Sequence, residues 1–237
     1  MSLLIGIHPV REALKAGRNL ERVLIAKGVA GPRMQEIVDL CRSSGVPVRF
    51  EQRSSLDRVA GGQPHQGVVA YGAAVRYRDL AEIAGKAKLL VVLDGVEDPH
   101  NLGAIIRTAN AAGADAVLVP ERRAAGLTDT VGKAAAGALE YLPVVRIGNV
   151  TRTLEDLRKS GFWIYGLDER GTEDYDRVDY ALPTVFVMGG EGSGIHQLVR
   201  ETCDVLVRIP MSGSIPSLNV SVATGIVLFD WKRRRNS

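Results

Sequence analysis

Residues 209–226 read IPMSGSIPSLNVSVATGI and join an apolar strand to an apolar helix. The strand over 205–209 ends at Pro210, and a loop of Ser, Gly and Pro residues follows it. Ser217 is the expected N-cap of the helix, because its hydroxyl can accept a hydrogen bond from a backbone N–H of the first turn. A loop with so little side-chain bulk lets a ligand contact the backbone. This junction is therefore where we expect the protein to work.

Hydroxyl side chains recur in the same stretch at positions i, i+4 and i+7, as Ser217, Ser221 and Thr224. On a helix this spacing places them along one stripe of an otherwise apolar surface. Two interpretations remain open: the hydroxyls bond to the helix's own carbonyl groups, or they face a polar ligand.

Strands and helices alternate strictly from Leu89 onwards. Apolar strands are expected over residues 89–93, 116–119, 144–147, 162–166, 184–188 and 205–209. Helices are expected near residues 102–112, 129–139, 151–160 and 195–201. The first strand is apolar at every position, which is typical of a parallel sheet covered on both faces. The pattern predicts a doubly wound α/β layer whose ligands bind beyond the carboxyl ends of the strands.

The chain before this layer is expected to fold as a small α/β unit. Its predicted strands cover residues 22–26, 46–50 and 67–75. Its predicted helices start at Pro9 and Pro32, each at the first helical position, and a short one surrounds Leu56. Residues 76–87 form a charged linker. We therefore expect one domain over 1–75 and a second over 88–237.

The composition is typical of a soluble globular protein, with 46% hydrophobic and 24% charged residues among 237. No apolar run approaches the roughly 20 residues of a membrane span, and the first residues lack the basic start of a secretory signal. The two cysteines, Cys41 and Cys203, are expected to be buried reduced thiols. We therefore expect a cytoplasmic protein with no membrane partner.

Charge is unevenly divided along the chain. Residues 1–78 hold 12 Lys and Arg against 6 Asp and Glu, whereas residues 79–237 hold 18 against 21. A basic first domain suits a partner with a phosphate backbone. A scattered, merely solvated surface would give the same count, so charge alone leaves both interpretations open.

Two further junctions carry unusual polar residues at strand ends. The first follows the strand over 89–93 and holds Asn101, a candidate helix cap, and Arg107 in the second turn of the helix. A surface salt bridge is the alternative for Arg107. The second, MGGEGSG over 188–194, places Glu191 among four glycines, where a carboxylate must be paired or face a ligand. Neither segment has the spacing of a dinucleotide-binding or phosphate-binding glycine loop.

Together the three junctions resemble the ordered motifs of the SpoU (TrmH-type) RNA 2′-O-ribose methyltransferases of the SPOUT superfamily. The motifs are NLGAIIR over 101–107, MGGEG over 188–192, and IPM over 209–211 with SLNVS over 217–221. The resemblance covers residues 88–235. Residues 1–75, with GIHPV at 6–10 and HQGVV at 65–69, resemble the family's RNA-binding extension. Full-length similarity is greatest to members that methylate a guanosine ribose in 23S rRNA.

The resemblance implies a trefoil-knotted α/β domain and an obligate homodimer, with S-adenosylmethionine (SAM) as the methyl donor and no metal. Its expected substrate is RNA, with 23S rRNA preferred, and not DNA. The residues expected to contact SAM are Gly189, Gly190, Ile209, Met211 and Leu218. The residues expected on the catalytic side are Asn101, Arg107, Glu191, Ser217 and Asn219. A tRNA substrate and a non-catalytic role in ribosome assembly are the alternatives.

Two roles are open to Arg107 in such a reaction. It could remove the proton of the 2′-hydroxyl, or it could hold the target phosphate and stabilise the forming alkoxide. A guanidinium group has a pKa above about 12, so its neutral form is costly. We therefore favour the second role, with Arg107 supplied by either subunit of the dimer.

Overall fold

The larger sheet is built from the strands that the apolar runs predict. In this computed structural model, which describes residues 2–214 and 217–235, the sheet has seven strands in the order β7-β6-β5-β10-β8-β11-β9. The strands are β5 (Leu89–Asp94), β6 (Ala116–Pro120), β7 (Val144–Ile147), β8 (Trp163–Leu167), β9 (Glu173–Asp174), β10 (Thr184–Gly189) and β11 (Val205–Arg208). Adjacent strands pair in parallel throughout the described sheet. The predicted parallel α/β layer is confirmed, and only the short edge strand β9 is unexpected.

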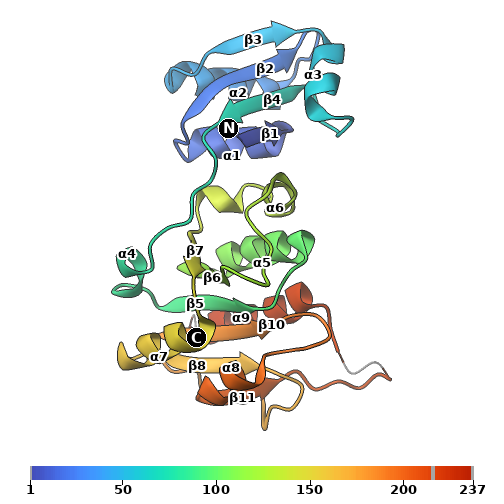
Figure 1. Cartoon of the computed structure of the whole chain (residues 1–237). Coiled ribbons are helices and arrows are strands. Elements are labelled where there is room, and N and C mark those ends of the chain that lie inside the picture. The colour runs from blue at the N-terminus through green and yellow to red at the C-terminus, as the bar shows by residue number, and fades with distance from the viewer. Residues whose placement is uncertain (1, 215–216, 236–237) are drawn as a thin grey trace.

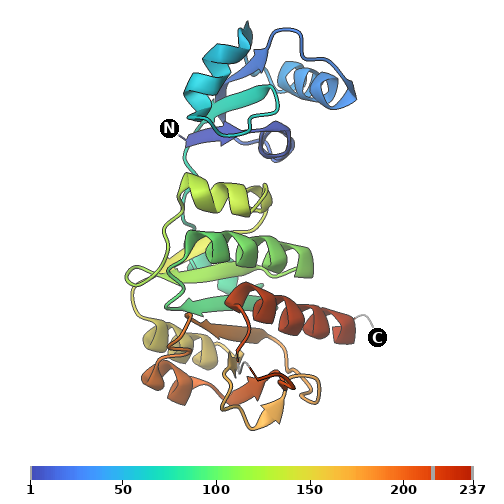
Figure 2. The same ribbon diagram turned by 90° about the vertical axis from the view of Figure 1, so that its right-hand side faces the viewer.

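Helices cover both faces of this sheet (Figure 1). They are α4 (Ala81–Ala84), α5 (Pro99–Ala112), α6 (Asp129–Ala134), α7 (Val150–Lys159), α8 (Gln197–Thr202) and α9 (Val220–Arg235). Figure 2 shows α6, α5 and α9 stacked along one face. Within the described part of the chain, no helix is long and apolar enough to cross a membrane.

The inner strand β5 contributes side chains to two separate cores. Leu89, Val91 and Leu93 pack in one core with side chains from α5, α6 and α9. Leu90 and Val92 pack in the other with side chains from α7 and α8. Because successive side chains of a strand point to opposite faces, an all-apolar strand fits a sheet that is buried on both sides.

The helix predicted over 129–139 ends early. α6 stops at Ala134, and a separate 3-10 turn covers Ala138–Glu140. Between them, Ala136 and Gly137 have φ angles of 48° and 88°. This left-handed backbone interrupts the helical hydrogen bonds, and Gly137 adopts it without the steric cost of a Cβ.

The N-terminal unit has a four-stranded sheet in the order β1-β4-β2-β3. Its elements are β1 (Ser2–Ile5), α1 (Ile7–Lys15), β2 (Leu20–Ala26), α2 (Pro32–Ser43), β3 (Val48–Glu51), α3 (Arg53–Ala60) and β4 (Val68–Gly72). The strand β1 is not predicted from the sequence, and the predicted helix start at Pro9 is wrong. The helix begins at Ile7, whose N–H donates to Gln66 Oε1 at 3.2 Å. Pro9 is the third helical residue, where a missing N–H leaves no helical hydrogen bond unmade.

The two units meet through the end of α1 and the segment after α6. Arg18 and Glu140 form an ion pair at 2.6 Å, with 9% and 8% of their side chains exposed. Arg18 also donates to the Ala73 carbonyl. The Tyr141 hydroxyl donates to the Glu12 carboxylate at 2.9 Å. The bonds of Arg18 to Glu140 and of Tyr141 to Glu12 join the small unit to one end of the larger one (Figure 1).

Both cysteines are free thiols, as predicted. Burial raises the pKa of Cys41 to about 11 and the pKa of Cys203 to about 12. Each thiol is therefore protonated and unreactive at neutral pH. Cys41 is fully buried, whereas Cys203 keeps some exposure.

Candidate active site

Three loops come together at the carboxyl edge of the larger sheet. The strands β5 and β10 are neighbours there, although four other strands separate them in the sequence. The Gly190 N–H donates to the Asp94 carbonyl at 2.8 Å and ties the loop after β10 to the loop after β5. The segment after β11 returns past the same edge into α9. In open α/β sheets, ligands bind where the order of neighbouring strands switches in this way.

Glycines let the loop after β10 turn sharply against its neighbour. Gly192 and Gly194 have φ angles of 79° and 63°. A Cβ on Gly189 would lie 2.2 Å from the carbonyl carbon of Gly194. A Cβ on Gly190 would lie 2.1 Å from the Gly95 carbonyl oxygen. The close backbone approach predicted from the glycines is therefore present. The backbone that the loop approaches belongs to the same chain, at Gly95 and Gly194.

A single side chain joins all three segments. Asn101 Nδ2 donates to Glu191 Oε1 at 2.6 Å, and Asn101 Oδ1 accepts from Asn219 Nδ2 at 3.0 Å. Asn219 Nδ2 also donates to Glu191 Oε1 at 3.2 Å. Asn101 is 7% exposed, whereas Glu191 and Asn219 reach the surface. We call these three residues the amide–carboxylate network; it pairs the carboxylate that the glycine loop would otherwise leave without a partner.

The cap of α5 is Asp98. Its carboxylate accepts a hydrogen bond from the His100 N–H at 2.8 Å. The cap predicted at Asn101 is therefore wrong, since Asn101 lies inside the first turn of the helix. Because Asp98 satisfies the first turn, the Asn101 side chain is available to the network.

The start of α9 also differs from the prediction. The helix begins at Val220, and Asn219 Oδ1 accepts from the Ser221 N–H at 2.9 Å and from its hydroxyl at 2.6 Å. Ser217 lies in the preceding loop, so both its predicted cap and its place in the hydroxyl stripe are wrong. The Thr224 hydroxyl donates to the Val220 carbonyl at 2.7 Å. The hydroxyls of α9 thus bond locally and do not face a ligand.

A cavity of about 700 Å³ lies beside the amide–carboxylate network. Its walls come from the loops after β8, β10 and β11 and from the start of α9. Eight of the ten predicted site residues line it: Gly189, Gly190, Glu191, Ile209, Met211, Ser217, Leu218 and Asn219. Residues 215–216 of the opening motif lie outside the part of the chain that the structure describes. The volume is in the range of pockets that enclose small organic ligands.

One wall of the cavity is not predicted from the sequence. It consists of Leu167 at the end of β8 and of Asp168, Glu169 and Arg170 in the loop after it. Because β8 lies between β10 and β11 in the sheet, its carboxyl end reaches the same edge. The charged residues directly after the predicted strand over 162–166 are the signal that could have indicated this wall.

Asp168 and Arg170 form a fixed pair in that wall. The Asp168 side chain is 1% exposed and accepts from Arg170 Nε at 2.8 Å and Nη2 at 3.1 Å. Arg200 Nη1 lies 3.8 Å from the same carboxylate. Burial alone would raise the pKa of Asp168, but the hydrogen bonds from Arg170 and the charges of both arginines outweigh it and lower the pKa. Asp168 is therefore ionised at neutral pH and holds Arg170 at the cavity.

Arg107 is not brought to the network within one chain. It lies in the third turn of α5 and not the second, it is exposed, and it does not line the cavity. Six residues at about 100° each place it roughly 120° around the helix from Asn101. Among the described residues Arg107 forms no ion pair, so the alternative of a surface salt bridge is not supported. Its neighbour Thr108 faces α9, since a Cβ on Gly225 would lie 3.6 Å from Thr108 Cγ2.

Two family profiles match the two units of this chain. The SpoU rRNA Methylase family matches residues 88–229, and the family described as RNA 2'-O ribose methyltransferase substrate binding matches residues 3–78. The chain belongs to the SpoU rRNA methylase family. The network, the glycine loop and the cavity all lie within the SpoU segment. The family predicted from three short motifs is confirmed, and the trefoil knot stays a prediction.

Relatives of this SpoU chain match it along almost its whole length. The "Putative TrmH family tRNA/rRNA methyltransferase YacO" of Bacillus subtilis (strain 168) is 41% identical, over 98% of this chain and 96% of the relative. The SpoU methyltransferase AviRb from Streptomyces viridochromogenes, in complex with the cofactor AdoMet (SAM), has a TM-score of 0.81 at 28% identity, over 99% of this chain and 90% of that one. The AdoMet-bound rRNA methyltransferase from Sinorhizobium meliloti has a TM-score of 0.81 at 27% identity, over 99% and 87%.

Proposed function

We propose that the protein transfers the methyl group of SAM to the 2′-hydroxyl of a guanosine ribose in 23S rRNA. The observation that carries this proposal is the amide–carboxylate network of Asn101, Glu191 and Asn219 beside the cavity. It offers polar groups that can orient a ribose next to a site large enough for SAM. Over its full length the sequence also resembles RlmB, which methylates a guanosine ribose in 23S rRNA.

The cavity suits SAM in size, polarity and charge. Ile209 and Leu218 offer apolar surface to an adenine ring, and Gly189 and Gly190 bring the backbone to the wall without side chains. SAM carries a sulfonium and no phosphate, in keeping with a glycine loop that lacks phosphate-binding spacing. Glu191 adds a negative charge, which favours a cationic ligand. Among the described residues no group of three or more His, Cys, Asp or Glu could hold a metal ion.

The network supplies the positioning that the reaction requires. Bound SAM supplies a methyl group on a positively charged sulfur, which leaves as a neutral thioether. Glu191 Oε1 accepts from both amides, which leaves Glu191 Oε2 to accept a hydrogen bond from a ribose hydroxyl. Ser217 and Asn219 line the cavity on the same side and orient the sugar. Holding two reactants in line in this way can contribute several kcal/mol to lowering the barrier.

Arg107 acts, in this proposal, from a second copy of the chain. Beside α5, the helix α9 exposes Val222 and Phe229 by 51% and 47%, and Ile226 lies between them on the same face. Apolar side chains at i, i+4 and i+7 form a stripe that a second copy can cover. In a homodimer built on this face, Arg107 of one subunit would hold the target phosphate at the cavity of the other. It would also stabilise the negative charge that develops on the 2′-oxygen as the hydroxyl proton passes to Glu191 Oε2 and on to water.

Ribosomal RNA is the preferred substrate over tRNA. Residues 3–78 match a substrate-binding domain, and the S. meliloti rRNA methyltransferase aligns with 99% of this chain, the small unit included. The excess of basic residues over 1–78 suits a phosphate backbone. The B. subtilis relative's name covers both tRNA and rRNA, so tRNA is the second candidate. Either substrate places the enzyme in the cytoplasm.

Methyl transfer from tritiated SAM tests the proposal. The protein is incubated with 23S rRNA and with tRNA from cells that lack the gene, and the labelled nucleotide is mapped by nuclease digestion and mass spectrometry. We expect label on the 2′-oxygen of a guanosine in 23S rRNA. Label in tRNA alone, or on a base, would overturn the proposed substrate or reaction. A non-catalytic assembly factor would transfer no label to either RNA.

A further inference from the structure

Two adjacent arginines, Arg122 and Arg123, lie in the loop after β6. Because β6 pairs in parallel with β5, the loops after both strands leave the same edge of the sheet. The Ala125 N–H donates to the Val96 carbonyl at 3.0 Å, and Val96 belongs to the loop that leads into Asn101. The loop that carries the arginines is therefore tied to the loop that leads into the amide–carboxylate network, although neither arginine lines the cavity.

Neither arginine has a side-chain partner among the described residues. Both are exposed, and within residues 2–214 and 217–235 neither forms an ion pair or a side-chain hydrogen bond. By contrast, Arg170 on the other side of the site is held by Asp168. Glu121 is the one acidic residue of the segment 121–128, so that segment carries a net positive charge. The two guanidinium groups are thus available to an anion.

The loop that carries them is held in place. Arg123 has a φ angle of 55°, which is uncommon for a residue with a Cβ and persists only where the surrounding structure supports it. That support comes from backbone bonds of Glu121 to Ile147 at 2.9 Å and of Ala125 to Val96 at 3.0 Å. A fixed loop loses little conformational freedom when it binds a ligand.

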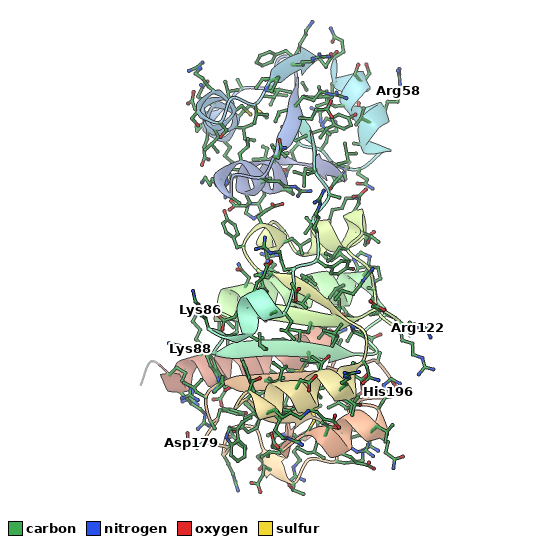
Figure 3. The ribbon with its side chains drawn as sticks, turned by 60° about the vertical axis from the view of Figure 1, so that its left-hand side comes forward. Arg58, Lys86, Lys88, Arg122, Asp179 and His196 are labelled. Atoms are coloured by element: carbon green, nitrogen blue, oxygen red, sulfur yellow. The ribbon has the colours of Figure 1, made fainter. Side chains whose placement is uncertain are left out.

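We infer that Arg122 and Arg123 bind phosphate groups of the RNA beside the methylated nucleotide. This rests on the proposed function and adds where the RNA backbone lies. Figure 3 shows Arg58, Arg122 and His196 along one side of the molecule, from the small unit to the active-site end. An RNA held by the small unit near Arg58 and inserted at the network would pass Arg122. The planar guanidinium matches a phosphate with two parallel hydrogen bonds.

Lys86 and Lys88 provide a matched control. Both are exposed, and Figure 3 shows them on the opposite side of the molecule from Arg122. The double variants R122Q/R123Q and K86Q/K88Q each remove two positive charges. Binding of a fluorescein-labelled oligouridylate is measured by anisotropy over a series of salt concentrations, because phosphate contacts do not depend on base sequence.

We expect R122Q/R123Q to bind the oligouridylate roughly tenfold more weakly than wild type and to reduce the slope of log K against log salt by about 1.4. K86Q/K88Q should bind like wild type, and R122K/R123K should keep most of the slope. SAM binding and thermal unfolding should be the same in all variants. Wild-type affinity and slope in R122Q/R123Q, or an equal loss in K86Q/K88Q, would overturn the inference.

Methylation kinetics separate this inference from the proposed function. The oligouridylate assay measures phosphate binding by the two arginines whether or not the enzyme is active. If the wild type methylates neither 23S rRNA nor tRNA, the proposed function is overturned, and the binding result still tests the inference. With an active enzyme, we expect R122Q/R123Q to raise KM for RNA and to leave KM for SAM unchanged. A fall in kcat without any change in RNA binding would contradict a phosphate-binding role.

Discussion

Asn101 connects three distant segments through one side chain, because its amide group donates to Glu191 and accepts from Asn219. Removing it leaves both partners in a partly desolvated site with one hydrogen bond fewer. We predict that Asn101→Ala lowers kcat/KM about 100-fold, since positioning and oriented hydrogen bonds carry much of the catalysis. Steady-state methylation measures this. Asn110→Ala, on the same helix and outside the network, is the matched control and should keep wild-type turnover.

Arg107 could act as a base or as a phosphate-binding group, and the substitution Arg107→Lys distinguishes these two roles. Lysine keeps the positive charge but loses the planar fork that binds phosphate through two hydrogen bonds. We predict that Arg107→Lys lowers kcat about tenfold or more and leaves the Kd for SAM unchanged, because the proposed contact of Arg107 is with the RNA phosphate and not with SAM. Steady-state methylation measures kcat, and calorimetry measures the Kd for SAM. Near-normal turnover of the lysine variant would argue against a bidentate role.

Asp168 should make the stability of the protein depend on pH in a defined direction. Its pKa is lower in the folded chain than in the unfolded one. Its stabilising contribution is therefore complete above about pH 4 and is lost as the pH falls through the folded-state pKa. We predict that Asp168→Asn lowers the free energy of unfolding by about 2 kcal/mol at neutral pH. In urea titrations this difference should narrow below about pH 4; a difference that widens there would contradict the assignment.

At the scale of elements, the start of α9 combines a structural and a catalytic task in one residue. Asn219 caps the helix through its oxygen and joins the network through its nitrogen. Serine caps as well as asparagine, but it lacks the amide nitrogen that donates to Asn101 and Glu191, and it adds no second carboxylate beside Glu191. We predict that Asn219→Ser keeps the melting temperature close to wild type and lowers turnover about 100-fold. Asn219→Ala should lose both, with about 1 kcal/mol of stability from the cap. Equal melting temperatures for the two variants would show that the cap contributes nothing.

The elements differ in how well the local sequence predicts their position. The strand β5 is predicted correctly because its burial on both faces leaves an all-apolar run in the sequence. The start of α9 is misplaced because Ser217 and Asn219 are both good caps, and the contact of Asn219 with Glu191 decides between them. The wall at Asp168 is missed because it depends on β8 lying beside β10 in the sheet. That order is a tertiary property, which local sequence does not encode.

At the scale of the whole molecule, the chain holds its substrate-binding unit and its catalytic unit in one arrangement. The ion pair of Arg18 with Glu140 is almost fully buried and joins residues that are far apart in the sequence. Nothing in the local pattern of either segment predicts this contact. The amide–carboxylate network, in contrast, is complete within one chain, and Ser217 lines the cavity beside it. Of the predicted catalytic residues, Arg107 alone lies away from both. A second subunit is therefore the element that the proposed site requires.

Mixing two inactive subunits tests that requirement. A subunit with Arg107→Ala keeps Asn101, and a subunit with Asn101→Ala keeps Arg107. If Arg107 acts across the interface, a mixed dimer has one complete site, whereas each variant alone has none. We predict that unfolding and refolding an equal mixture restores about a quarter of wild-type activity, because half of the dimers are mixed and each has one working site of two. If Arg107 acts within its own chain, the mixture stays as inactive as its parts, and the trans arrangement is refuted.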